Sequence, residues 1–245
     1  MAPACLTPDD TAPEVVSTDR IILNGLPASV LQANEHDLGA LGGASLAVAA
    51  PKSGLLATAD GRTALGYVVA CALPASASIT LGGASYAGGV GLAPEWATSA
   101  PTASNRRWVT ACVLARTNLY GVHVEISMRG ANPALQPTIA EGLGYLITEG
   151  AYYGDLFAPT GPTEYACLGL LKSTGLSLST LSERACAAPD GNGGDTACGF
   201  QFAGACGVLD LGLAPACTSL TAPYGNCRGG STRYSEVITV DLATL

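Results

Sequence analysis

The sequence predicts an α+β fold in which two helices, cross-linked by a disulfide, pack on an antiparallel, disulfide-stapled β region. Two segments with helical spacing of apolar residues lie in the first half of the 245-residue chain. Strand-like segments and six of the nine cysteines occupy the second half. We expect a flexible N-terminal tether over residues 1–20 and a single domain over 21–245, with a helical half at about 21–121 and a β-rich, cysteine-rich half at about 122–245.

The segment 104–130 is the central element, a helix that runs into a strand. Ser104 is the expected N-cap and Gly121 the expected C-terminal cap. The apolar face of this helix consists of Trp108, Ala111, Cys112, Ala115 and Leu119. Residues 122–128 then alternate between apolar and polar side chains, which is the period of a half-buried strand.

The second predicted helix covers residues 60–73, with Asp60 as its cap and Pro74 just past its end. Its apolar stripe contains Leu65, Val68, Val69 and Ala72. Because Cys71 and Cys112 lie beside the apolar faces of the two helices, we predict a disulfide between them. Closing a loop of about 40 residues would stabilise the fold by ~3–4 kcal/mol.

The remaining segments are predicted to form short strands and turns. Residues 21–48 suggest short turns over the core, and 79–81 with 86–92 a glycine-rich hairpin. Residues 143–148 and 152–157 predict either two strands of a hairpin or one long bent strand. Further strands are expected at 165–171, within 198–206 and at 236–242, while 176–187 predicts a short helix or a loop.

Composition argues against a nucleic-acid-binding protein and against a membrane-spanning protein. Charged residues make up only 12% of the chain and the net charge is −8, whereas nucleic-acid binding requires clustered Lys and Arg. Hydrophobic residues reach 48%, but no apolar run approaches the ~18 residues that span a bilayer. We therefore expect neither a nucleic-acid partner nor a transmembrane segment.

The cysteines predict an oxidising compartment. They are dispersed, form no CxxC, and only two histidines accompany them, so the usual zinc patterns are absent. The predicted disulfide framework uses Cys71, Cys112, Cys167, Cys186, Cys198, Cys206, Cys217 and Cys227. No signal-peptide pattern opens the sequence, so we expect a mature extracellular or cell-surface form from which a signal peptide was removed. Cys5, ahead of a Pro/Asp/Thr-rich stretch, is either a lipidation site, a free thiol or an interchain link.

Several phrases resemble a functionally uncharacterised group of secreted, cysteine-rich proteins of myxobacteria. They are YVVACAL at 67–73, GLAPEWA at 91–97, RWVTACVLARTNLYGVHVEISMRG at 107–130 and EGAYYGDLF at 149–157. LNGLP at 23–27 is similar to a remnant of the Leu-Asn-Gly repeats found in such proteins. The resemblance implies secretion and a shared fold, and it assigns no catalytic residue.

Two catalytic arrangements are candidates. His123 and Glu125 would share one face of a strand, where they could act as a base and its orienting carboxylate, although no G-x-S-x-G elbow supplies a nucleophile. The alternative is a histidine on a polar face that is hydrogen-bonded to a neighbour. A glycosidase would instead need two carboxylates ~5–10 Å apart, with Glu95, Glu125 and Glu149 as candidates.

Ligand binding has its own candidates. Trp96, Tyr152 and Tyr153 could form an aromatic platform with Asp155 beside it, or they could belong to the core. In the loop at 189–195, Asp190, Asn192 and Asp195 offer the oxygen ligands that calcium prefers, or form an ordinary turn. We expect no cofactor other than calcium at this loop, because no nucleotide-binding motif is present.

The function that we predict is binding. Low charge and abundant Ser, Thr and Gly favour a secreted or surface-attached protein that binds an extracellular polymer or envelope component, with glycan as the candidate ligand. The alternative is a secreted hydrolase that uses His123 with a nearby carboxylate, or a carboxylate pair.

Overall fold

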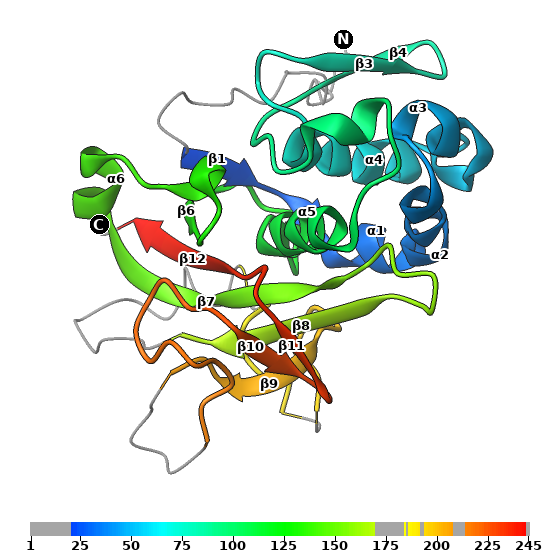
Figure 1. Cartoon of the computed structure of the whole chain (residues 1–245). Helices are drawn as coiled ribbons and strands as arrows, with labels where there is room; N and C mark the ends of the chain where they lie inside the picture. The colour runs from blue at the N-terminus through cyan, green and yellow to red at the C-terminus, as the bar shows by residue number, and fades with distance from the viewer. Residues whose placement is uncertain (1–20, 170–183, 185, 192–193, 208–213, 244–245) are drawn as a thin grey trace, which may run out of the picture.

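A six-stranded sheet in the order β1-β6-β12-β7-β8-β9 forms the middle of the molecule (Figure 1). Its strands are β1 (Ile21–Asn24), β6 (Val124–Arg129), β12 (Ile238–Ala243), β7 (Tyr145–Asp155), β8 (Thr163–Leu168) and β9 (Gln201–Ala205). Every pair of neighbours is antiparallel except β8 and β9. The computed structural model describes residues 21–169, 184, 186–191, 194–207 and 214–243.

Helices cover one face of this sheet, and cysteine-rich segments cover the other (Figure 1). The helices are α1 (Ala28–Ala33), α2 (Glu35–Gly39), α3 (Leu46–Ala49), α4 (Ala59–Ala72), α5 (Ala103–Ala115) and α6 (Ile139–Gly144). Short 3-10 helices lie at η1 (Ala40–Gly43), η2 (Ala50–Lys52), η3 (Gly54–Leu56), η4 (Pro94–Ala97) and η5 (Pro133–Leu135). The predicted α+β fold class is confirmed.

Strand β7 is the longest strand of the sheet, and from Glu149 to Asp155 it is buried on both faces. Because neighbouring side chains of a strand point to opposite faces, Tyr152 joins the core under the helices and Tyr153 joins the core under the cysteine-rich segments. The segment predicted as a hairpin or one bent strand is therefore a single strand, preceded by α6.

The two central helices begin earlier than the sequence predicts. Thr58 caps α4 by accepting a hydrogen bond from the Gly61 amide, and Thr102 caps α5 by accepting one from the Asn105 amide. Both threonines have the extended backbone of an N-cap, so the expected caps Asp60 and Ser104 lie inside the first turn.

The disulfide predicted between the two helices is confirmed: Cys71 and Cys112 are bonded and fully buried. Helix α5 ends at Ala115, earlier than expected, because the chain leaves it to form a short parallel pair, β2 (Leu26–Pro27) with β5 (Thr117–Asn118). Gly121 is left-handed, with φ of 68°, but lies in the connection to β6 and not at the helix end.

The other hairpins are short. The predicted glycine-rich hairpin forms as β3 (Ser78–Leu81) with β4 (Ala84–Ala87), so its second strand begins and ends earlier than the predicted 86–92. A further hairpin pairs β10 (Cys227–Gly229) with β11 (Thr232–Tyr234).

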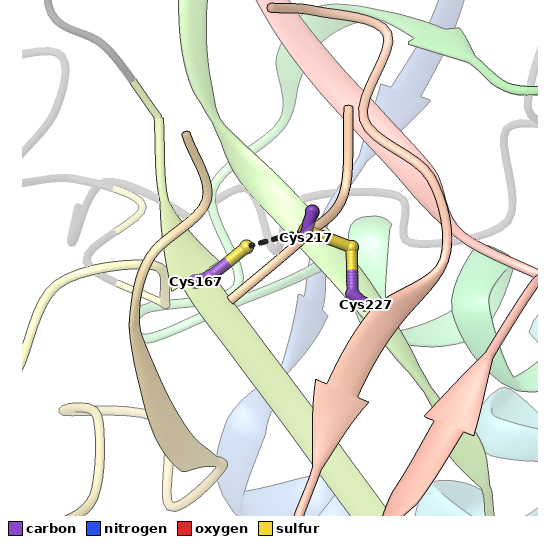
Figure 2. A group of neighbouring side chains, drawn as sticks. All are labelled: Cys167, Cys217 and Cys227. Carbon is purple, nitrogen blue, oxygen red and sulfur yellow. Dashed lines mark hydrogen bonds between the residues drawn. A yellow bond between two sulfur atoms is a disulfide. The ribbon is translucent and has the colours of Figure 1, made fainter. Parts of the chain in front are cut away.

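The three further disulfides are Cys167–Cys206, Cys186–Cys198 and Cys217–Cys227, so all eight cysteines of the predicted framework are paired. Cys167 lies near the Cys217–Cys227 disulfide, with 3.8 Å between the Sγ atoms of Cys167 and Cys217 (Figure 2). Cys5, the ninth cysteine, lies outside the described residues.

Within the described ranges, no helix is long and apolar enough to cross a bilayer.

Candidate binding site

Three tyrosines form a layer between the sheet and the cysteine-rich segments. The ring centroids of Tyr153, Tyr165 and Tyr234 lie 5.6–5.7 Å apart in each pair. The Tyr153 hydroxyl donates a hydrogen bond to the Arg228 carbonyl over 2.8 Å, which ties β7 to β10. Burial raises the pKa of the Tyr153 and Tyr165 hydroxyls above their usual value, so both remain neutral hydrogen-bonding groups at physiological pH.

A hollow of about 430 Å³ opens at the edge of this layer, and we call it the Tyr165 hollow. It lies between β9, the β10–β11 hairpin and the loop that precedes Cys198. Its aromatic and polar lining residues, with the glycine at the turn of the hairpin, are Tyr165, Asp195, Gln201, Phe202, Arg228 and Gly230.

Backbone contacts fix the walls of the Tyr165 hollow. A β-carbon at Gly229 would lie 2.5 Å from the Tyr165 ring, so only glycine lets β10 pack this closely on the tyrosine. At the loop that precedes Cys198, the Phe202 amide donates to the Gly194 carbonyl over 2.8 Å, and the Asp190 amide donates to the Asp195 carbonyl over 3.0 Å.

The lining has the chemistry of a site for an uncharged polar ligand. Gln201 and Arg228 are exposed and supply donors, Asp195 is exposed and supplies acceptors, and Phe202 is a half-buried apolar surface beside them. The positive charge of Arg228 and the negative charge of Asp195 offset each other. Aromatic surface with a few polar groups around it is the usual composition of a small-molecule or glycan subsite.

A second hollow, of about 420 Å³, lies near η5 and is lined by Arg129, Gln136 and Tyr224, among others. The Arg129 guanidinium is already engaged there. It lies 2.9 Å from the Asp241 carboxylate and donates to the carbonyls of Glu141 and Tyr145. Fewer of its donors therefore remain for a ligand than those of Arg228 in the Tyr165 hollow.

The structure does not assemble the predicted histidine site. His123 precedes β6 and is exposed, and its ring lies beside Gly25, where an added β-carbon would be 2.8 Å from the ring. Glu125 is exposed and accepts a hydrogen bond from the Tyr145 hydroxyl over 3.2 Å. Among the described residues, no hydrogen bond or ion pair joins His123 to a carboxylate, so the base–carboxylate pair stays a prediction without a contact that supports it.

The other predicted catalytic carboxylates also have separate structural roles. Glu149 is buried and forms an ion pair of 2.7 Å with the buried Arg184, which also donates to the Ala115 carbonyl. Glu95 is exposed on η4 and accepts a hydrogen bond from Asn105. The structure thus gives each of these carboxylates a different partner.

The predicted aromatic platform belongs to the core. Trp96 is fully buried, packs edge-on against Phe157 at 4.8 Å and donates to the Ala44 carbonyl. Tyr152 and Tyr153 are fully buried because β7 is covered on both faces. Asp155 is buried in an ion pair of 3.1 Å with Arg106.

The predicted calcium loop is only partly described, because Asn192 lies outside the described residues. Asp190 and Asp195 are exposed, and the Asp190 amide donates a hydrogen bond to the Asp195 carbonyl. Within the described ranges, the only cluster of three or more potential metal ligands is a group of cysteines, and it includes neither aspartate. Of the predicted site residues, Asp195 alone lines the Tyr165 hollow.

Sequence reasoning missed Tyr165, Gln201, Phe202 and Arg228. They come from three strands that the disulfides bring together, and no local motif marks them. No family model matches the chain, and no curated protein or solved structure is detectably similar to it.

Proposed function

We propose that this protein is a secreted or surface-attached binding protein whose Tyr165 hollow holds a segment of an extracellular polymer, with a glycan chain as the ligand. The observation that carries the proposal is the lining of the hollow, which combines Phe202 with exposed Gln201, Asp195 and Arg228. Four disulfides and the absence of a membrane-spanning helix from the described residues are compatible with an extracellular location.

A glycan fits this chemistry better than a charged polymer does. Sugar hydroxyls both donate and accept hydrogen bonds, which suits an amide, a carboxylate and a guanidinium placed around one aromatic surface. The net charge of −8 would repel a polyanion, and the single arginine of the hollow is offset by Asp195. Secretion, as the resemblance to the myxobacterial group implies, stays part of this proposal.

The alternative hydrolase receives less support. It requires His123 near a carboxylate, or two of Glu95, Glu125 and Glu149 close together, and each of these residues has a different environment in the fold. Binding without catalysis is therefore the function we favour.

The test is co-sedimentation of the purified, oxidised protein with insoluble cellulose, chitin and peptidoglycan. Arg228→Ala should weaken the retained interaction by about 10-fold or more, because a hydrogen bond to a charged group contributes ~1.5–3 kcal/mol. The matched control is Arg233→Ala, since Arg233 lies directly opposite Arg228 in the β10–β11 hairpin and does not line the hollow. Retention by none of the three polymers, or equal losses for the two arginine variants, would overturn the proposal.

A further inference from the structure

Helix α6 packs on the sheet through a polar side chain and turns its aliphatic side chains outward. Glu141 is its only buried residue. Ile139 is 87% exposed, Leu143 is 73% exposed, and Leu146, near the start of β7, is 59% exposed. Ile139 and Leu143 are four residues apart and so share one side of the helix. A surface helix normally turns its apolar stripe to the core, so this arrangement is inverted. We call Ile139, Leu143 and Leu146 the α6 tip.

Hydrogen bonds to Glu141 hold the inverted helix in place. Its carboxylate accepts from the Thr138 amide over 2.9 Å and from the Ser127 hydroxyl over 3.3 Å. The Arg129 guanidinium donates to the carbonyls of Glu141 and Tyr145. Because β6 and the helix cap supply these contacts, a fixed helix presents the aliphatic side chains to solvent.

The segment that carries the α6 tip exposes no charged side chain. Glu141 is the only Asp, Glu, Lys or Arg in residues 130–147, and it is 1% exposed. An apolar medium can therefore cover the tip without desolvating a charge of this segment. The exposed charge bonded to the segment is Glu125, which accepts from the Tyr145 hydroxyl and is negative.

The N-terminal segment joins the domain beside the α6 tip. Residues 1–20 connect to Ile21 of β1, which pairs with Ser127 of β6, and Ser127 contacts Glu141 of α6. Figure 1 shows β1 and α6 on the same side of the molecule. Residues 1–20 contain Cys5, the predicted lipidation candidate. A membrane contact at the tip is thus compatible with a lipid on Cys5 and does not depend on one.

We propose that the α6 tip inserts into the interface of a zwitterionic phospholipid bilayer, so that the domain rests on a membrane surface without crossing it. The tip exposes on the order of 400 Å² of apolar surface, about half of the ~800 Å² that each partner buries in a stable protein complex. Such an area is too small for a stable dimer, whereas membrane binding grows with each apolar group that is buried. The net charge of −8 and the exposed Glu125 favour zwitterionic over anionic headgroups.

The test is flotation of the oxidised full chain with unilamellar vesicles of phosphatidylcholine. We expect a saturable fraction of the protein to float, and a smaller fraction when the vesicles also contain phosphatidylglycerol. Ile139→Asp with Leu143→Asp should decrease the vesicle-bound fraction by about 10-fold or more, because two apolar anchors are lost. The milder pair Ile139→Ser with Leu143→Ser should decrease it in the same direction.

The matched control is Val48→Asp. Val48 is 48% exposed on α3, which Figure 1 places on the side of the molecule away from α6. This variant should leave the vesicle-bound fraction within about twofold of the wild type. Circular dichroism of all variants should match the wild type, since every substituted position is exposed.

Three outcomes would overturn the proposal: no flotation of the wild type, equal losses in the α6 and Val48 variants, or tighter binding to anionic vesicles. Sedimentation velocity without lipid tests whether a second copy covers the tip instead. A dimer that dissociates in the α6 variants would overturn the lipid assignment, and a monomer would support it. The α6 variants should retain polymer as the wild type does, because their substitutions lie outside the Tyr165 hollow. Failure of membrane binding is therefore distinguishable from failure of polymer binding.

Discussion

Glu164 should make the stability of this protein fall as the pH rises. Its side chain lies on β8, is only 8% exposed, and its Oε1 atom has no hydrogen-bond partner. Burial raises the pKa of this carboxyl from 4.5 to about 8, and the negative charge of Glu35 on α2 adds to the shift. The carboxyl is therefore protonated in the folded protein at neutral pH.

The sign and size of the effect follow from proton linkage. Below pH 4.5 the carboxyl is protonated in both the folded and the unfolded chain, so stability is at its full value. Between pH 4.5 and about 8 the unfolded chain loses this proton while the folded chain keeps it, so the free energy of unfolding falls. A shift of this size is equivalent to roughly 5 kcal/mol over the whole window, at ~1.4 kcal/mol per pH unit.

The assay compares the wild type with Glu164→Gln, which retains the size of the side chain and removes its charge. Urea unfolding at intervals from pH 4 to pH 9 should show the variant gaining stability relative to the wild type, by roughly 5 kcal/mol at the upper end. Glu95→Gln is the control, because it replaces an exposed carboxylate and should change stability by less than about 0.5 kcal/mol.

A difference between the wild type and Glu164→Gln that does not vary with pH would refute the reasoning. Glu35→Gln provides a second test, because it removes the neighbouring charge that raises the pKa of Glu164. The pH at which the Glu164 effect levels off should then decrease, and an increase would contradict the assignment.

Two further predictions concern packing in the core. Arg184→Met leaves Glu149 buried without its ion-pair partner, so it should lower the free energy of unfolding in urea by ~3–5 kcal/mol. A decrease below about 1 kcal/mol would show that the pair is not buried in solution. Gly42→Ala places a β-carbon 2.1 Å from the Phe157 carbonyl oxygen. Because the backbone must shift to relieve this clash, the free energy of unfolding measured by thermal denaturation should decrease by ~1–3 kcal/mol. Gly43→Ala, with open space around its β-carbon, should be nearly neutral, and equal effects of the two substitutions would contradict this packing.

Local patterns were sufficient to predict much of the fold. The apolar stripes predicted the two central helices, and the position of Cys71 and Cys112 on them predicted their disulfide. Helix ends were less predictable, because Asp60 and Ser104 are also good capping residues and only the extended backbone of the preceding threonines decides between them.

The candidate site could not be predicted in the same way. Glu149, Asp155 and Trp96 have residue types that suit a ligand site, but partners distant in sequence bury them. Conversely, Tyr165 and Arg228 become neighbours of one hollow only through strand pairing and disulfides in the last third of the chain. No spacing within a single segment carries that information.

The measurement that tests the central claim most directly is a nuclear magnetic resonance titration of the oxidised, isotopically labelled protein with soluble oligosaccharides of the polymer it retains. Binding in the Tyr165 hollow predicts saturable shifts in the amide signals of Gln201, Phe202, Arg228 and their neighbours. Shifts confined to the hollow near Arg129 and Tyr224, or no saturable shift at any position, would contradict the claim.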